Sequence, residues 1–142
     1  MSDTTTSLAQ GGDPATRKAR PLSPHLSIYK PIPTMVMSIL HRFTGAALYF
    51  GTFLVVWWLL ALASGPDAYA RVEWFFGSVV GLIVLAGYTF VLVHHALGGL
   101  KHLVQDTSAA LGKAETTTMA LAQPVVALLL TVAIWVAALL IA

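Results

Sequence analysis

Three long stretches of the sequence are almost entirely apolar and contain no Asp, Glu, Lys or Arg. They cover residues 43–66, 74–100 and 116–142. Each reaches the roughly 20 residues that span a hydrocarbon core about 30 Å thick. A soluble three-helix bundle would need a polar stripe along each helix, whereas these stretches are apolar nearly all round. The pattern therefore predicts an all-α integral membrane fold with three transmembrane helices, at about 34–64, 72–105 and 119–142.

The chain before the first span divides into two parts. Residues 1–20 consist mainly of Thr, Ser, Gly and charged residues, which is typical of a mobile tail. Residues 21–33 contain four prolines, which disfavour a regular helix and favour an extended surface strap. The membrane anchor then covers 34–142, with Thr34 as candidate N-cap of the first helix and Pro124 in the first turns of the third. No cleaved signal or transit peptide is expected, because the N-terminal segment lacks an apolar core and includes acidic residues.

The 8 basic residues are distributed unevenly around the three spans. Arg71 lies between the first and second spans, and the other seven lie before the first span or between the second and third. Because cytoplasmic loops carry an excess of Lys and Arg, we expect the N-terminus in the cytoplasm. The chain has no cysteine, which excludes a thiolate-bound iron–sulfur cluster and a disulfide framework but not a haem held by histidine.

The second span ends in VHHALGGLKHLVQD, where His95 and His102 are seven residues apart and share one helical face. Gly98 and Gly99 lie between them and leave space for a flat group or for another helix. An imidazole in lipid beside such a surface suits an axial haem ligand, and helix packing through the glycines is the alternative. His94 points about 100° away from His95, so we expect it to contact a neighbouring helix or a partner chain.

The first span opens with SILHRFTG, in which Ser38, His41 and Arg42 lie on one stripe of the helix. A hydroxyl, an imidazole and a guanidinium together suit the propionates of a haem or the carbonyl oxygens of a quinone. An isolated arginine at this depth would instead extend to the lipid headgroups. His41 and His95 have similar depths from the interface, so either His41 or a histidine of another chain completes an axial pair.

Three motifs in this order, RPLSPHLSIY, SILHRFTG and H-x6-H followed by LVQD, resemble the cytochrome b-type large membrane-anchor subunit of succinate dehydrogenase (respiratory complex II). The resemblance runs from Arg20 to about Asp106, and the third helix matches only in type. It implies packing with a second three-helix anchor subunit around one haem b, with one axial histidine from each chain. Lys101 stands where the family often has Arg, and it keeps the charge but lacks the bidentate fork.

The resemblance also implies roles for single residues. His95, which begins H-x6-H, is implied as the ligand of the haem iron. His41, Arg42 and His102 are implied near the haem propionates. Ser38 and Arg42 are implied in the ubiquinone site, next to the iron–sulfur subunit.

The leading hypothesis is therefore a non-catalytic subunit of a succinate:quinone oxidoreductase, which helps to form the ubiquinone-reduction site. Its expected partners are a second anchor subunit, an iron–sulfur subunit, a flavoprotein subunit and membrane lipid, with no nucleic acid. A purely structural anchor without haem is one alternative, and a stand-alone b-type cytochrome with His41 and His95 as ligands is another. We expect the bacterial inner membrane as the location, ahead of the mitochondrial inner membrane.

Overall fold

The computed structural model describes residues 22–141, so the tail predicted over 1–20 lies outside the described residues. The chain separates into two units, residues 1–30 and 31–142, which are described one at a time. In the described part of the first unit, the 3₁₀ turn η2 (His25–Ile28) interrupts irregular chain. This stretch forms no α-helix, as its prolines predict.

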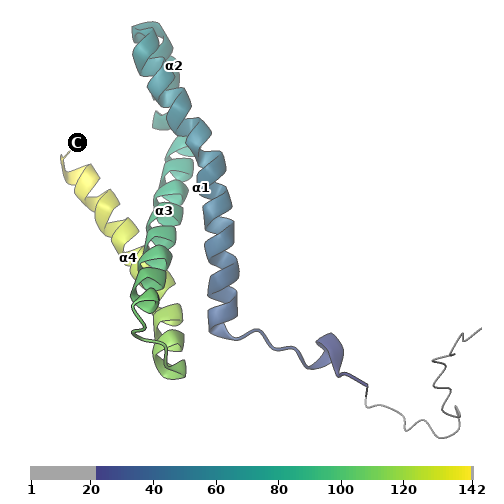
Figure 1. Cartoon of the computed structure of the whole chain (residues 1–142). Coiled ribbons are helices and arrows are strands. Elements are labelled where there is room, and N and C mark those ends of the chain that lie inside the picture. The colour runs from purple at the N-terminus through teal and green to yellow at the C-terminus, as the bar shows by residue number, and fades with distance from the viewer. Residues whose placement is uncertain (1–21, 142) are drawn as a thin grey trace, which may run out of the picture. The chain divides into compact units, whose positions relative to one another are not determined.

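The second unit is built from α-helices (Figure 1). They are α1 (Pro33–Ser64), α2 (Pro66–Gly77), α3 (Val79–Asp106) and α4 (Lys113–Ile141). By length and composition, α1, α3 and α4 are able to cross a membrane. The prediction of an all-α fold with three long apolar helices is therefore confirmed, and α2 is an additional short helix.

α1 begins and ends at residues with special backbone properties. It starts at Pro33 with Ile32 as the N-cap residue, so Thr34 is already helical and the prediction that it caps the helix was wrong. Proline suits the first helical position because its φ is fixed near the helical value and its missing N–H would have no partner there. α1 is followed by Gly65, whose φ of 109° and ψ of 178° form a conformation that essentially only glycine adopts.

The helix predicted without interruption over 72–105 is divided at Ser78, where α2 and α3 meet. The Ser78 side chain accepts a hydrogen bond from the Gly81 N–H at 3.1 Å and so caps α3. A Cβ on Gly81 would lie 2.1 Å from the Phe75 carbonyl oxygen, so the corner requires glycine. The apolar pattern does not reveal this corner, because no proline or charged residue lies between Trp74 and Val80.

α4 begins at Lys113 rather than near Met119, so the polar residues predicted as a connection form its first turns. The Gly112 N–H donates to a carboxylate oxygen of Glu115 at 3.2 Å, which satisfies one of the free donors at the helix start. Pro124 consequently lies inside the helix and not in its first turns as predicted. There it cannot donate a hydrogen bond to the carbonyl of the residue four positions earlier.

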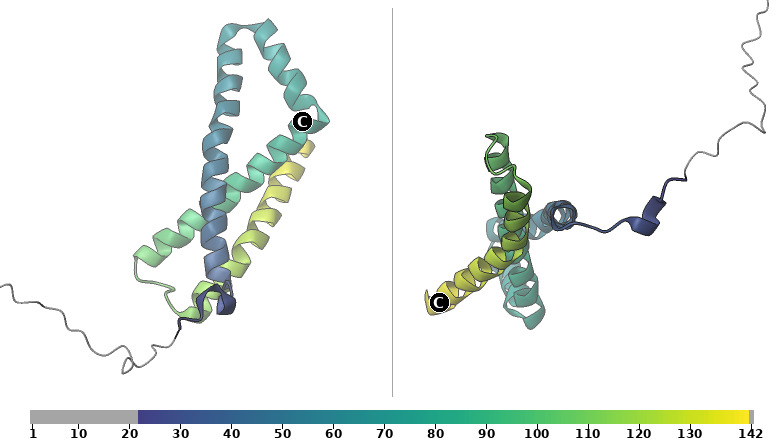
Figure 2. Two further views of the ribbon diagram at one scale, coloured as in Figure 1. Left: turned by 90° about the vertical axis from the view of Figure 1, so that its right-hand side faces the viewer. Right: turned by 90° about the horizontal axis from the view of Figure 1, so that it is seen from below.

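α3 is the central element of the second unit and contacts α1, α2 and α4. Figure 2 shows it running obliquely past α1. The buried residues are mostly small, and among them are Gly51, Ala61, Gly81, Gly98, Ala120 and Ala127. Small residues allow helices in lipid to approach closely. Only 11% of the most apolar stretch of each long helix is buried within the chain, so most of this surface is left for lipid or other subunits.

Candidate functional site

Three of the 5 histidines come together between α1 and α3. The His41 ring of α1 stacks on the His95 ring of α3, with centroids 4.0 Å apart and planes inclined by 22°. The His102 ring meets the His41 ring edge-on, with centroids 5.4 Å apart. We call His41, His95 and His102 the histidine cluster. The sequence predicted that His95 and His102 share one face of the helix, and the structure places that face against α1.

The Nδ1 atom of His95 is held by α1. It lies 3.1 Å from the backbone carbonyl oxygen of His41 and 3.2 Å from the hydroxyl oxygen of Thr44. The Thr44 hydroxyl donates its own proton to the same carbonyl at 2.9 Å, which leaves its oxygen as an acceptor. Because both neighbours of Nδ1 accept, Nδ1 carries a proton, and in the neutral imidazole Nε2 is then the nitrogen with the free lone pair.

The Nε2 atom of His95 is available as a ligand, because no hydrogen bond from the described residues occupies it. A neutral imidazole with Nδ1–H fixed by a carbonyl is the usual form of a metal-ligating histidine.

Two glycines, Gly45 on α1 and Gly98 on α3, leave space for the rings of the histidine cluster. A Cβ on Gly45 would lie 3.0 Å from Cε1 of His95, and a Cβ on Gly98 would lie 2.2 Å from Cδ2 of His41.

His41 and His95 do not face each other across a space for a shared iron. Two axial imidazoles point end-on at one metal, with their ligating nitrogens about 4 Å apart if each metal–nitrogen bond is roughly 2 Å. Stacked rings instead direct their nitrogens sideways in nearly parallel planes. The geometry therefore does not support the alternative in which both histidines ligate one iron within a single chain.

The side chains of the cluster have the chemistry to provide an axial ligand and polar contacts to a haem. Across residues 22–141, no group of three or more His, Cys, Asp or Glu side chains is arranged to hold a metal ion. Haem iron differs, because the porphyrin supplies most of its ligands and the protein adds only axial ones. His95 offers one axial nitrogen. The Nε2 atom of His41 is buried and lacks a hydrogen-bond partner among the described residues. In the tautomer that carries its proton on Nε2, this atom can donate to a carboxylate.

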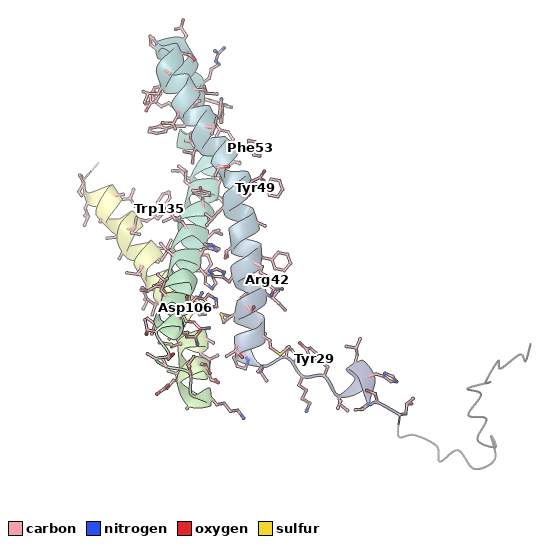
Figure 3. All side chains as sticks on the ribbon, viewed as in Figure 1. Tyr29, Arg42, Tyr49, Phe53, Asp106 and Trp135 are labelled. Carbon is pink, nitrogen blue, oxygen red and sulfur yellow. The ribbon has the colours of Figure 1, made fainter. Side chains whose placement is uncertain are left out.

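Ser38 and Arg42 lie on a different side of α1 from the histidine cluster. Both are exposed, and Figure 3 shows Arg42 on the side of α1 that faces away from α3. They border an open hollow of about 310 Å³, which is lined by Thr34, Met35, Ser38, Ile39 and Arg42. The structure thus brings Ser38 and Arg42 together and separates His41 from them, because adjacent helical residues point about 100° apart.

His94 lies on a further side of α3, where it faces α4. It is 2% exposed, and Gln123 of α4 is 7% exposed. The Gln123 Nε2 atom donates to the backbone carbonyl of His94 at 3.1 Å and lies 3.4 Å from the ring Nε2 of His94. The prediction that His94 contacts a neighbouring helix or a partner chain agrees with this contact to α4.

Comparison with known protein families gives a match over most of the chain. Residues 16–139 match the model of the family described as succinate dehydrogenase/fumarate reductase transmembrane subunit. This chain belongs to that family. It is a multi-pass membrane subunit of the succinate dehydrogenase complex, and the resemblance inferred from its three motifs is confirmed.

Relatives of this succinate dehydrogenase subunit include bacterial and mitochondrial proteins. The succinate dehydrogenase cytochrome b556 subunit of Paracoccus denitrificans is 43% identical over 90 residues, which are 63% of this chain and 69% of that protein. The b556 subunit of Rickettsia prowazekii (strain Madrid E) is 33% identical over 117 residues, 82% of this chain and 91% of the relative. The mitochondrial cytochrome b560 subunit of Sus scrofa is 36% identical over 115 residues, 80% of this chain and 66% of the relative.

Two polar residues of this succinate dehydrogenase subunit were not assigned a role from the sequence. Thr44 holds His95, and its position three residues after His41 was the available signal, because that spacing keeps it on the same helical face. Gln123 holds His94, and its signal was a lone amide within an apolar span, where polar side chains are costly.

Proposed function

We propose that this subunit anchors succinate dehydrogenase in the membrane, holds one haem b together with a second anchor subunit, and forms part of the ubiquinone-reduction site. Electrons from succinate reach the quinone through the flavoprotein and iron–sulfur subunits. The observation that carries the proposal is the fixed Nδ1 and available Nε2 of His95 beside α1. The names of the relatives, cytochrome b556 and b560, agree with a b-type haem.

In this proposal the Nε2 atom of His95 is the axial ligand of the haem iron. The bound haem supplies a one-electron store. The His41 carbonyl and the Thr44 hydroxyl keep the imidazole in one tautomer and one orientation, and they increase the basicity of Nε2. The rings of His41 and His102 supply donors for the propionate carboxylates, whereas Arg42, on another side of α1, serves the quinone alone.

The second axial histidine comes from the second three-helix anchor subunit. The face-to-face stacking of His41 on His95 supports this assignment, because it leaves His95 without an opposing nitrogen from its own chain. The large apolar side chains left exposed on α1, for example Phe43 at 69% and Phe50 at 66% exposed, leave surface for this subunit or for lipid.

Ser38 and Arg42 bind the quinone in the open hollow on α1. The Ser38 hydroxyl donates a hydrogen bond to one quinone carbonyl oxygen. The Arg42 guanidinium stabilises the negative charge that develops on the quinone as electrons arrive, before two protons from the aqueous side complete its reduction. In this proposal the iron–sulfur subunit covers the hollow. The hollow therefore lies on the cytoplasmic side of a bacterial inner membrane, as do the N-terminus and the α3–α4 connection.

The quinone role is tested with Arg42→Leu in the purified complex. We expect succinate:ubiquinone reductase activity to fall roughly 100-fold, the usual loss when one donor to a developing oxyanion is removed. Oxidation of succinate by a water-soluble dye should stay unchanged, because the dye takes electrons before the membrane site. Arg71→Leu is the matched control, since Arg71 is also exposed but lies beyond the other end of α1. Unchanged quinone reduction in Arg42→Leu would contradict the role.

The haem role is tested with His95→Ala in the same complex. The dithionite-reduced minus oxidised spectrum should lose its b-type α-band, and extracted haem per flavin should fall, while His25→Ala leaves both unchanged. A full α-band in His95→Ala would exclude His95 as the ligand. An unmodified complex with neither band nor extractable haem would support the structural anchor without haem.

A further inference from the structure

Gln123 is the only amide in the third apolar run of the sequence, and the structure buries it against α3. Buried polar groups in a membrane span are costly unless they are hydrogen-bonded. The contact partner of Gln123 is His94, the residue directly before His95. Gln123, which lies outside the three motifs, thus donates a hydrogen bond to the backbone directly before the proposed haem ligand.

The orientation of the Gln123 amide follows from its neighbours. Its nitrogen lies 3.1 Å from the His94 carbonyl oxygen, and the reverse orientation would place two carbonyl oxygens against each other. The same nitrogen lies 3.4 Å from the His94 ring Nε2, which accepts a hydrogen bond from it in the tautomer that carries the proton on Nδ1. The amide therefore contacts both the backbone and the ring of His94 and fixes their position relative to α4.

Gln123 also meets the histidine cluster through Gly98. A Cβ at Gly98 would lie 3.0 Å from the Gln123 Nε2 atom and 2.9 Å from the His41 Nε2 atom. Gly98 of α3 therefore lies between the Gln123 amide of α4 and the His41 ring of α1. The His41 ring in turn stacks on the His95 ring, so Gln123 is near His95 through His94 and also through Gly98 and His41.

The residue after Gln123 is Pro124, which removes one backbone hydrogen bond from α4 next to the contact with His94. Pro124 has no N–H, so one turn of α4 lacks a hydrogen bond of its own ladder. Elsewhere between these two helices, the indole N–H of Trp135 donates to the Thr89 hydroxyl at 3.3 Å. Thr89 precedes His95 by more than one helical turn, whereas His94 adjoins it, so of these two α3–α4 contacts the Gln123 contact is the nearer to the proposed ligand.

We propose that Gln123 is a positioning residue that orients the His95 imidazole by holding α3 at His94. This inference rests on the proposed function, in which His95 ligates the haem. The orientation of an axial imidazole affects the low-spin EPR signal and the reduction potential of the iron, which respond to ligand geometry and to the hydrogen bonds around it. Both properties can be measured without turnover of the enzyme.

The test uses Gln123→Leu in the purified four-subunit complex, a substitution of similar size without the amide. We expect the haem to remain bound, its ferric EPR signal to shift to a different highest g-value and its midpoint potential to change. Thr131→Val is the matched control, because Thr131 is also buried on α4 but donates only to the Ala127 carbonyl of its own helix. Its EPR signal and potential should equal those of the unmodified complex.

An unchanged EPR signal and potential in an assembled Gln123→Leu complex would overturn the inference. If that variant does not assemble, Gln123→Asn decides by the same two measurements, because it keeps an amide but shortens its reach. A shift of equal size in Thr131→Val would also overturn the inference, since it would indicate general loosening of α4. His95→Ala separates the two proposals: a haem signal that persists there removes the proposed function, whereas its loss there with no shift at Gln123 removes this inference alone.

Discussion

At the scale of single residues, the candidate site depends on which nitrogen of each histidine is engaged. His95 has its Nδ1 atom between two acceptors of α1, and this arrangement leaves Nε2 for a ligand. The sequence identified His95 from its spacing to His102, but it did not predict the tautomer. That choice depends on the His41 carbonyl and the Thr44 hydroxyl, and both come from another helix.

Thr44→Val tests the contribution of the hydroxyl to ligand binding. The substitution keeps the shape of the side chain and removes one of the two acceptors at Nδ1, while the His41 carbonyl remains. Loss of a partner of this kind weakens metal binding by about 10–100-fold, and we expect the lower end of that range. The measurement is the rate at which the purified complex loses haem to an excess of haem-free globin.

Thr52→Val is the control for this experiment, because the exposed Thr52 hydroxyl donates only to the Tyr49 carbonyl of its own helix. Its haem loss should match that of the unmodified complex. Equal rates in Thr44→Val and Thr52→Val would show that the hydroxyl does not support His95.

At the scale of helices, close packing depends on small residues at the crossings. The sequence predicted that Gly98 and Gly99 leave space beside the histidines, without distinguishing the two. In the structure only Gly98 faces α1 and α4, and a Cβ on Gly99 would meet nothing within 4 Å. The angular position of each residue depends on the rotation of α3, which the contacts with α1 and α4 set.

Gly98→Ala and Gly99→Ala form a matched pair for this crossing. The new Cβ of Gly98→Ala would lie 2.2 Å from Cδ2 of His41, so the His41 ring or the helix must move. Overpacking of this kind costs about 1–3 kcal/mol, and we expect a lower thermal midpoint and less haem per flavin in the purified complex. Gly99→Ala should change neither quantity. Equal behaviour of the two variants would contradict the crossing as described.

At the scale of the whole molecule, the described chain has a small buried core and a large apolar surface. The buried positions are mostly glycine, alanine and a few polar residues, while large side chains such as Phe53, at 65% exposed, face outward. A soluble protein would not leave such a surface to water. Lipid and partner subunits are therefore part of the environment in which this fold is stable.

The orientation in the membrane can be tested with single cysteines, because the chain contains none. Ala109→Cys lies in the connection between α3 and α4, and Asp67→Cys lies at the start of α2. We expect a membrane-impermeant maleimide to label Ala109→Cys only from the cytoplasmic side and Asp67→Cys only from the opposite side. The basis is the excess of basic residues before α1 and on either side of the α3–α4 connection, where Lys101 and Lys113 lie. The reverse pattern would overturn the proposed topology.

The sequence by itself determined that the chain forms three long apolar helices, because the length and apolarity of a span are properties of one continuous segment. It also determined that histidines gather at one end of these spans, since position along a helix follows from residue number. The family membership was visible for the same reason: its motifs are short and continuous.

Only the tertiary structure decided how these segments are interrupted and how they meet. The corner at Ser78 depends on the approach of the Phe75 carbonyl to Gly81, and the division of SILHRFTG into a ring facing α3 and a guanidinium facing away depends on the rotation of α1. The contact of Gln123 with His94 joins residues 29 positions apart. Such contacts arise from the packing of helices against each other, which a periodic pattern within one helix does not specify.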